Sequence, residues 1–354
     1  RKMTEQYQVI YFGFNNPLVH KRGVENVILF QSQSLEKDIE KYYVFFGNKD
    51  EEFIWENIKC ISIKHDLFRF FKLNLKIREI LKKGKTIIHS HNYLMSFFLW
   101  RNTDIFTVND GLYYLSSQVK HKYKNIFKII EKAVYRKSKL VHFISEFSKK
   151  QSLYKGNKDI IIYITTPLEK VQLKNGQKKW IEDKVKIFTV RSIEERANIE
   201  LLIELAEKNP NYSIRIAGKG PLFDKYNQVL KEKNLKNFKL LGYISDEEVV
   251  EHYAECDLVT VIAKYGEGFG LPIIEGYLHN RPVFASNTCA IPEIVINNKF
   301  LVENNSDDLT KKIKDYLNGK EGRYNFKEYY NSRFSYKKIL SEYKEMYDKV
   351  LKNL

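Results

Sequence analysis

Residues 265–275 read YGEGFGLPIIE, a glycine-rich stretch in which two glutamates, Glu267 and Glu275, stand eight positions apart. Glycine allows a ligand to approach the backbone closely, and proline is favoured in the first turn of a helix. The stretch therefore predicts a strand that ends, a tight glycine loop, and a helix that begins near Pro272.

This arrangement also indicates a kind of ligand. The unbonded N–H groups at a helix N-terminus favour an anion such as a diphosphate. Carboxylates accept hydrogen bonds and repel phosphate, so Glu267 and Glu275 would face hydroxyl groups instead. Sugar and ribose carry such hydroxyls, and a nucleotide sugar combines them with a diphosphate. The stretch therefore predicts a nucleotide-sugar site.

Together with PVFAS at residues 282–286 and IPEIV at residues 291–295, the stretch closely resembles the E-x7-E signature of glycosyltransferase family 4, the retaining transferases of GT-B fold. The resemblance implies that Glu267 contacts the donor sugar and that Glu275 holds the ribose hydroxyls. It assigns the diphosphate to the loop backbone, at Gly268, Phe269, Gly270 and Leu271.

A second segment, TVRSIEERAN at residues 189–198, is similar to the family's Gly-Arg-x4-Arg-Lys-Gly pattern, in which an Arg and a Lys neutralise the leaving diphosphate. Arg191 matches the Arg by its spacing. Ala197 takes the place of the Lys, and the adjacent Arg196 is the candidate to supply the charge, although on a helix it would point about 100° away from Ala197. Alternatively, either arginine pairs with one of the two glutamates between them.

Further donor-binding positions follow from the resemblance. Gly218 stands in the family's phosphate turn of the second domain, and backbone groups at Tyr243 and Ile244 would flank the base. Gly23 is matched to the turn that faces the donor phosphate. Asn109 stands where many members have a histidine near the outer hydroxyls of the sugar. Because an amide donates and accepts hydrogen bonds but does not take up or release a proton near neutral pH, no acid–base role carries over to Asn109.

Length and pattern predict two α/β domains. The 354 residues suit two domains of ~100–200 residues, and short apolar runs alternate with helical stretches in each half, as in a parallel, doubly wound sheet. With the resemblance, this implies a GT-B architecture of two Rossmann-like domains facing across a cleft. We expect an acceptor-binding domain over residues 1–168 and a donor-binding domain over residues 169–335, with a linker at 169–183. The last helix, about 336–354, is a candidate to pack on the first domain.

Positive charge is concentrated in the first half. The net charge is +16, and residues 1–165 hold 29 Lys and Arg against 16 Asp and Glu. This asymmetry predicts an anionic partner, with nucleic acid, a membrane surface and a pyrophosphate lipid as candidates. Residues 68–83 and 120–139 mix apolar and basic side chains at helical spacing, as membrane-binding helices do. The alternative is the solvated face of an ordinary amphipathic helix. The sequence contains no motif typical of nucleic-acid binding.

The expected reaction is transfer of a sugar, with retained configuration, from a nucleotide diphosphate to a saccharide acceptor, with uridine as the default nucleoside. If the membrane interpretation holds, the acceptor is lipid-linked and belongs to cell-surface polysaccharide assembly. A protein or a diacylglycerol acceptor stays open. The expected place is the cytoplasmic face of the membrane, since the three cysteines form no framework and no apolar run reaches the ~18–20 residues of a span.

No metal or other cofactor is expected, because side-chain cations serve the diphosphate in the family. His89 and His91, at a predicted strand end facing the cleft, leave a metal site as a minor alternative. One rival function is a GT-B protein without catalysis, a partner subunit of another transferase, which Ala197 and Asn109 favour. A sugar-nucleotide epimerase would need acid–base groups that the sequence does not place.

Overall fold

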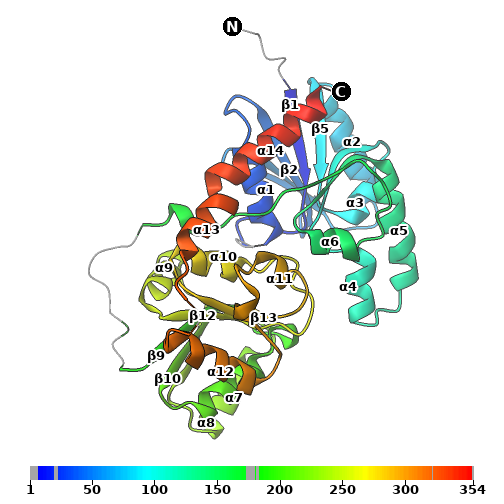
Figure 1. The fold of residues 1–354 in the computed structure, drawn as a ribbon. Helices are drawn as coiled ribbons and strands as arrows, with labels where there is room; N and C mark the ends of the chain where they lie inside the picture. The colour runs from blue at the N-terminus through cyan, green and yellow to red at the C-terminus, as the bar shows by residue number, and fades with distance from the viewer. Residues whose placement is uncertain (1–6, 20–22, 173–179, 181–182, 321, 353–354) are drawn as a thin grey trace. The chain divides into compact units, whose positions relative to one another are not determined.

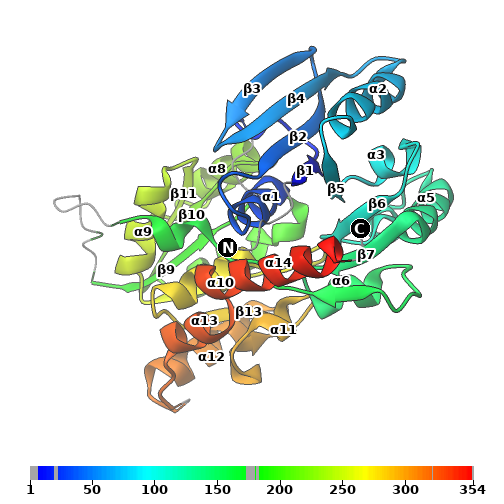
Figure 2. The same ribbon diagram turned by 90° about the horizontal axis from the view of Figure 1, so that it is seen from above.

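The computed structural model describes residues 7–19, 23–172, 180, 183–320 and 322–352. Figures 1 and 2 show the ribbon from two directions. The chain forms two compact units, the first from residues 1–164 and 337–354 and the second from residues 165–336. The predicted alternation of strands and helices is confirmed in both units.

The first unit is built on one sheet. Its strands are β1 (Tyr7–Phe12), β2 (Glu40–Gly47), β3 (Glu51–Trp55), β4 (Ile58–Lys64), β5 (Lys85–Ser90), β6 (Thr103–Val108), β7 (Ser138–Phe143) and β8 (Asp159–Ile161). They lie in the order β3-β4-β2-β1-β5-β6-β7-β8. Neighbouring strands are parallel except β3, which runs antiparallel to β4 at the edge.

Helices cover both faces of this sheet. They are α1 (Val24–Gln33), α2 (Arg69–Leu81), α3 (Tyr93–Phe98), α4 (Leu112–Gln118), α5 (Lys124–Lys137), α6 (Glu146–Gln151) and, from the end of the chain, α14 (Tyr336–Leu351). Successive strand side chains point to opposite faces. On one face, Ile88 packs with Leu73 of α2, and Val141 packs with Val134 of α5.

On the opposite face, a chain of buried hydrogen bonds fastens α14 to the sheet. The carbonyl of Ile162 only accepts, so Nε2 of His142 donates to it (3.0 Å) and Nδ1 accepts from the Thr107 hydroxyl (2.9 Å). Thr107 in turn lies 2.7 Å from Nε2 of His89, whose Nδ1 lies 2.7 Å from the hydroxyl of Tyr347 in α14. Residues from β5, β6, β7 and α14 thus share one network.

The second unit is a six-stranded sheet in which all neighbours are parallel. Its strands are β9 (Val185–Val190), β10 (Tyr212–Ala217), β11 (Phe238–Gly242), β12 (Leu258–Val261), β13 (Val283–Ser286) and β14 (Leu301–Val302). They lie in the order β11-β10-β9-β12-β13-β14, the 3-2-1-4-5-6 order of dinucleotide-binding folds. The order reverses between β9 and β12, and ligands bind beside the carboxyl ends of strands at such a point.

The helices of the second unit connect these strands. They are α7 (Ile199–Lys208), α8 (Phe223–Glu232), α9 (Asp246–Glu255), α10 (Leu271–Leu278), α11 (Ile291–Ile294), α12 (Ser306–Leu317) and α13 (Phe326–Arg333). Helix α10 begins beside Pro272, as the glycine-rich stretch predicts. No helix in the described ranges is long and apolar enough to cross a bilayer.

Two local features differ from the expectations. The hairpin of β3 and β4 is not predicted, because its two-residue turn is Glu56-Asn57, both at positive φ, whereas such turns are usually marked by Asn-Gly or Asp-Gly. In the expected linker, residues 173–179 and 181–182 lie outside the described residues. Glu169 lies within the second unit, where its carboxylate accepts a hydrogen bond of 2.6 Å from Tyr330.

The buried histidines make the stability of the first unit depend on pH. Burial lowers the pKa of His142 from 6.5 to about 4 and lowers those of His89 and His91 well below 6.5. Because these folded-state pKa values lie below the unfolded value, the stabilisation is complete above about pH 6.5 and is lost as pH falls from there towards 4. Each histidine then contributes about 1.4 kcal/mol per pH unit.

We expect the free energy of unfolding of the first unit to fall by several kcal/mol between pH 7.5 and pH 5, with about 2 kcal/mol from His142 alone. Urea unfolding of a Trp180→Phe variant measures this, because the remaining tryptophans, Trp55 and Trp100, both lie in the first unit. In His142→Gln, the free energy of unfolding should depend less on pH, because about one proton fewer is taken up on unfolding. Equal stability at the two pH values would contradict the prediction.

Candidate functional site

Three predicted residues of the second unit, Arg191, Arg196 and Glu267, lie at the point where the strand order reverses. Arg191 directly follows β9, and the loop that holds Glu267 follows β12. β9 and β12 are neighbours in the sheet, with Val259 beside Phe188. Parallel strands end at the same edge, so two segments far apart in sequence meet there.

Arg191 and Glu267 form a buried ion pair. Nη1 of Arg191 lies 2.6 Å from Oε2 of Glu267, and the two side chains are 7% and 13% exposed. Nε of Arg191 is also buried, and no described residue accepts a hydrogen bond from it. The pairing differs from the alternative that the sequence raises, in which Arg191 would pair with Glu194 or Glu195.

Arg196 holds the glycine loop, residues 265–270, by a hydrogen bond. Its Nε donates to Glu194 (2.8 Å), as one alternative anticipates, and its Nη1 donates to the carbonyl of Gly266 (2.6 Å). Its own carbonyl accepts from the amide of Lys264 (2.8 Å). Ala197, at the position of the missing lysine, is buried at 1% exposure. Arg196 therefore has a structural role, and its predicted role towards a diphosphate stays a prediction.

The glycine loop is shaped by backbone conformations that suit glycine. Gly266 has φ 67° and Gly270, the residue before α10, has φ 93°. The carbonyl of Glu267 accepts from the amide of Ala290 (3.1 Å), which ties the loop to the start of α11. Phe269 turns inward, with its ring 6.0 Å from that of Phe334. The loop thus leads directly into the first turn of α10. Gly268 lies in the bend before Gly270, and Leu271 is the first residue of α10.

Glu275 is buried within α10 at 4% exposure. Its Oε1 accepts from the Thr166 hydroxyl (3.1 Å) and its Oε2 accepts from the Tyr253 hydroxyl (2.8 Å). The sequence gives no signal for these partners, because they lie 109 and 22 positions away. Both partners are hydroxyl groups, which are also the hydrogen-bond donors that a ribose offers. An ionised carboxylate has about four acceptor positions, so these two hydrogen bonds do not use all of them.

Gly218 is required by close backbone packing. It has φ 136°, and a Cβ at this position would lie 1.9 Å from the carbonyl oxygen of Arg191. Its amide donates to the carbonyl of Gly242 (2.7 Å). Beyond Gly242, Tyr243 is 69% exposed and Ile244 is half-buried. The turn after β10 therefore supports the backbone of Arg191, whether or not it also contacts a ligand.

In the first unit, Gly23 and Asn109 lie at the ends of different elements. Gly23 precedes α1 at φ 91°, and apart from its chain neighbours no described atom lies within 4 Å of the place that a methyl group on it would take. Asn109 follows β6, and its Nδ2 lies 3.4 Å from Nδ1 of His91. Nε2 of His91 lies 2.9 Å from Oε1 of Gln31, so His91 donates there and accepts from Asn109. This orients the amide of Asn109.

The expectation that His89 and His91 face a cleft is wrong. Both are buried, at 0% and 1% exposure, and both make hydrogen bonds inside the first unit. Across the described residues, no group of three His, Cys, Asp or Glu side chains is placed to hold a metal ion.

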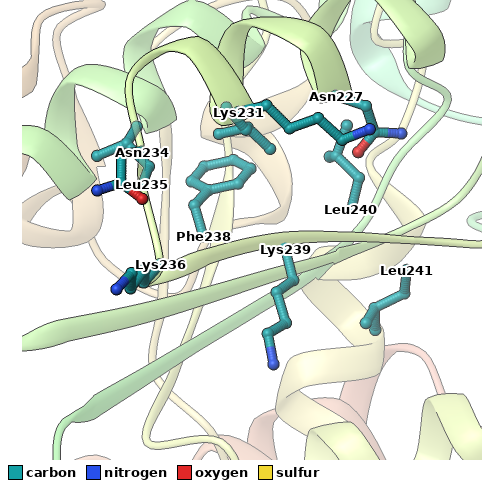
Figure 3. A pocket seen from close by; sticks show the side chains of 10 residues that line it. Asn227, Lys231, Asn234, Leu235, Lys236, Phe238, Lys239, Leu240 and Leu241 are labelled. Carbon is teal, nitrogen blue, oxygen red and sulfur yellow. The ribbon is translucent and has the colours of Figure 1, made fainter.

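A separate hollow of about 460 Å³ lies on the second unit (Figure 3). It is lined by α8, the following turn and β11, and includes Lys231, Lys236 and Lys239. None of the predicted site residues lines it.

The ion pair should be energetically coupled. We expect Arg191→Met to destabilise the second unit by about 3–5 kcal/mol, because it leaves the Glu267 carboxylate buried without a partner. Adding Glu267→Gln should recover at least about 1.5 kcal/mol of that loss. Urea unfolding followed by Trp180 fluorescence, with Trp55 and Trp100 changed to Phe, measures this double-mutant cycle. Effects that add within about 0.5 kcal/mol would contradict the coupling.

The packing of Gly218 gives a second prediction, with Gly319 as its matched control. Gly319 also has positive φ, 75°, but among the described residues it has open space where a Cβ would lie. Gly319→Ala should therefore cost only the backbone strain, about 1–2 kcal/mol. Gly218→Ala should cost about 1–3 kcal/mol more, because the new methyl overlaps the Arg191 carbonyl. The same tryptophan probe reports both variants, and equal losses would argue against the close packing.

Comparison with known families agrees with this geometry. Residues 171–333 match the model of the family described as glycosyl transferases group 1. An uncharacterized glycosyltransferase of Methanocaldococcus jannaschii is 31% identical over 159 residues, 43% of this chain and 44% of that protein. The O-antigen biosynthesis glycosyltransferase WbnH of Escherichia coli is 27% identical over 203 residues, 56% of this chain and 57% of that protein. The chain thus spans about half the length of these relatives.

Solved structures resemble the whole chain. Sucrose-phosphate synthase from Thermosynechococcus elongatus has a TM-score of 0.79 at 17% identity, covering 99% of this chain and 100% of that one. HepE of Anabaena, solved in complex with UDP and glucose, has a TM-score of 0.74 at 16% identity, covering 97% and 99%. The chain has the GT-B fold, and its residues 171–333 match the family described as glycosyl transferases group 1.

Proposed function

We propose that this protein is a retaining glycosyltransferase of the family 4 type. It transfers a hexose from a nucleotide diphosphate sugar, with a UDP-sugar as the first choice of donor. The acceptor is a lipid-linked saccharide in cell-surface polysaccharide synthesis. The observation that carries the proposal is the buried pair of Arg191 and Glu267. It lies at the strand-order reversal of a dinucleotide-binding sheet, beside the N-terminus of α10.

The diphosphate would bind at the start of α10. The first turn of a helix leaves backbone N–H groups without partners inside the helix and carries partial positive charge. Arg191 supplies a full positive charge, and its buried Nε has no described partner. As the glycosidic bond breaks, the diphosphate gains negative charge, so donors fixed in a dry site would stabilise the transition state.

The two glutamates would hold the hydroxyl groups of the donor, Glu267 those of the sugar and Glu275 those of the ribose. In the proposed step, the bond between the sugar C1 and the phosphate oxygen breaks and the phosphate keeps the electron pair. The acceptor oxygen forms its bond to C1 on the same face, and its proton passes to the leaving phosphate. The proposed step needs no separate base, and it needs no metal because Arg191 and the N-terminus of α10 supply the positive charge.

The choice of uridine draws support from fold relatives. HepE, at 16% identity, is solved with UDP and glucose. In this chain, the backbone beyond Gly242 would lie beside the base, with Tyr243 exposed at the turn. The acceptor assignment draws on WbnH, whose name places that protein in O-antigen biosynthesis, and on the basic first unit, which suits an anionic lipid at the cytoplasmic face of the membrane.

One observation favours a second candidate, a partner subunit without catalysis. Arg196 is bonded to Glu194 and to the carbonyl of Gly266, and Ala197 is buried. The second cation expected for the diphosphate is therefore engaged elsewhere. Activity requires that Arg191 and the helix N-terminus suffice, or that Arg196 exchanges partners when the donor binds.

A panel of nucleotide sugars tests the proposal through slow donor hydrolysis without acceptor. We expect one donor to be hydrolysed, and we expect Arg191→Gln and Glu275→Gln to lower that rate by about 10²–10³, the effect of removing one preorganised electrostatic group. Lys231→Gln, in the hollow of Figure 3, is the control that should keep the rate. Circular dichroism confirms folding of each variant at the assay temperature.

The opposite outcome is also informative. If no nucleotide sugar binds or is hydrolysed at millimolar concentration, catalysis is excluded and the partner-subunit function takes its place. If Lys231→Gln loses as much activity as Arg191→Gln, the site is not the one proposed.

A further inference from the structure

Three helices of the first unit lie next to one another on one face of its sheet. α2, α3 and α5 cover the same face of the sheet and follow one another across it in both views (Figures 1 and 2). Asn74 of α2 bonds to the carbonyl of Phe98 (3.0 Å) and the amide of Trp100 (2.7 Å). Nζ of Lys137 in α5 bonds to three carbonyls at the end of α3, that of Leu99 at 2.6 Å. The end of α3 is thus fixed between its neighbours.

The outer surface of these three helices exposes large apolar side chains. We call it the α2–α5 surface. Leu67 is 87% exposed, and Trp100 and Ile129 are 65% exposed each. The ring of Phe71 lies 5.9 Å from that of Trp100, which joins α2 to the end of α3. The exposed apolar residues within these three helices or directly beside them are Leu67, Phe68, Phe71, Leu75, Leu94, Phe98, Trp100, Tyr123, Ile126 and Ile129.

Every exposed charge along α4 and α5 is positive. Residues 112–139 contain one acidic residue, Glu131, and eight basic ones: Lys120, Lys122, Lys124, Lys128, Lys132, Arg136, Lys137 and Lys139. Glu131 is 0% exposed. Its carboxylate accepts hydrogen bonds from the backbone amides of Tyr113 (2.7 Å) and Leu153 (2.8 Å), so it stabilises the interior of the unit.

The basic side chains at the outer face of α5 are not neutralised by the protein. In the part of the chain that the structure describes, no carboxylate lies within ion-pair distance of Lys124, Lys128 or Lys132. On α2, by contrast, Lys72 pairs with Asp50 and Asp66. The uncompensated charge therefore concentrates on α5, next to the apolar residues.

The charge and the apolar side chains together indicate what kind of partner binds the α2–α5 surface. Ile126 and Ile129 are exposed three residues apart in α5, so they lie on one side of the helix, and the exposed Tyr123 directly precedes it. Burial of aliphatic side chains away from water is favourable, and the lysines beside them would pair with negative charges of the same partner. A bilayer with anionic headgroups offers both. A nucleic acid offers the phosphates but no apolar layer for isoleucine.

We infer that the α2–α5 surface docks the protein on an anionic lipid bilayer, with the apolar side chains of α2, α3 and α5 at the acyl boundary and the α5 lysines among the headgroups. The inference rests on the proposed function only in its biological purpose, since a lipid-linked acceptor is met at a membrane. The docking itself is independent of catalysis.

Co-sedimentation with vesicles tests the docking. The full chain is mixed with vesicles of phosphatidylcholine, alone or with about one third phosphatidylglycerol. We expect binding to the anionic vesicles and its weakening by salt. Lys124→Glu/Lys128→Glu/Lys132→Glu should lower binding about hundredfold or more, since each lysine near the surface contributes roughly fivefold. Ile126→Ser/Ile129→Ser should weaken it at least about tenfold and leave the salt dependence unchanged.

Matched controls separate this surface from general charge. Lys231→Glu/Lys236→Glu/Lys239→Glu makes the same charge change in the exposed hollow of the second unit (Figure 3). Ile54→Ser/Leu317→Ser removes exposed apolar side chains elsewhere, which are 64% and 46% exposed. Both should bind as the unchanged chain does. Equal loss in these controls, or no vesicle binding by the unchanged chain, would overturn the inference.

Two further measurements fix the interpretation. Donor hydrolysis without vesicles should be the same in the α5 variants as in the unchanged chain. Vesicle binding without donor hydrolysis would leave the docking surface standing and would reject the proposed function alone. If a 20-nucleotide RNA bound tightly through the same three lysines and vesicles did not bind, the partner of the surface would be a nucleic acid, and the inference would be rejected.

Discussion

The buried ion pair of Arg191 and Glu267 is the interaction on which the second unit's candidate site depends. Two charges removed from water lose several kcal/mol of solvation each, and an apolar pair in their place is often as stable or more stable. Stability alone therefore gives little reason for this pair. The position of the pair gives a better reason, because it lies where the strand order reverses beside the first turn of α10. Under the proposed function, a fixed cation and a fixed hydroxyl acceptor would there face one ligand.

The surrounding backbone serves the same arrangement. Gly218 lets the turn after β10 rest on the Arg191 carbonyl, and Gly270 lets the chain turn sharply into α10. Arg196 holds the Gly266 carbonyl, and Thr166 with Tyr253 holds Glu275. These contacts lie inside one unit and order the site before any ligand arrives. Preorganisation of this kind reduces the reorganisation that a charged transition state requires.

The sequence predicted the parts of the fold that local chemistry decides. Alternating apolar runs predicted most strands, and Pro272 after the glycines predicted the start of α10. It could not predict that Arg191 pairs with Glu267, because residues 76 positions apart meet only through the order of the strands. Nor could it predict the burial of His89 and His91, since an apolar strand pattern does not reveal which polar residue finds partners on α14 or α1. The turn at Glu56-Asn57 was missed because neither residue is the glycine that usually marks such a hairpin.

In the proposed function, a nucleoside diphosphate binds the second unit at the edge formed by β9, β12 and α10. Hydrogen–deuterium exchange with and without UDP, GDP or ADP would detect this binding. We expect that one of the three slows amide exchange in residues 189–196 and 264–275 and leaves residues 227–241, at the separate hollow, unchanged. Protection at residues 227–241 instead, or no protection of either segment by any of the three nucleotides, would contradict it.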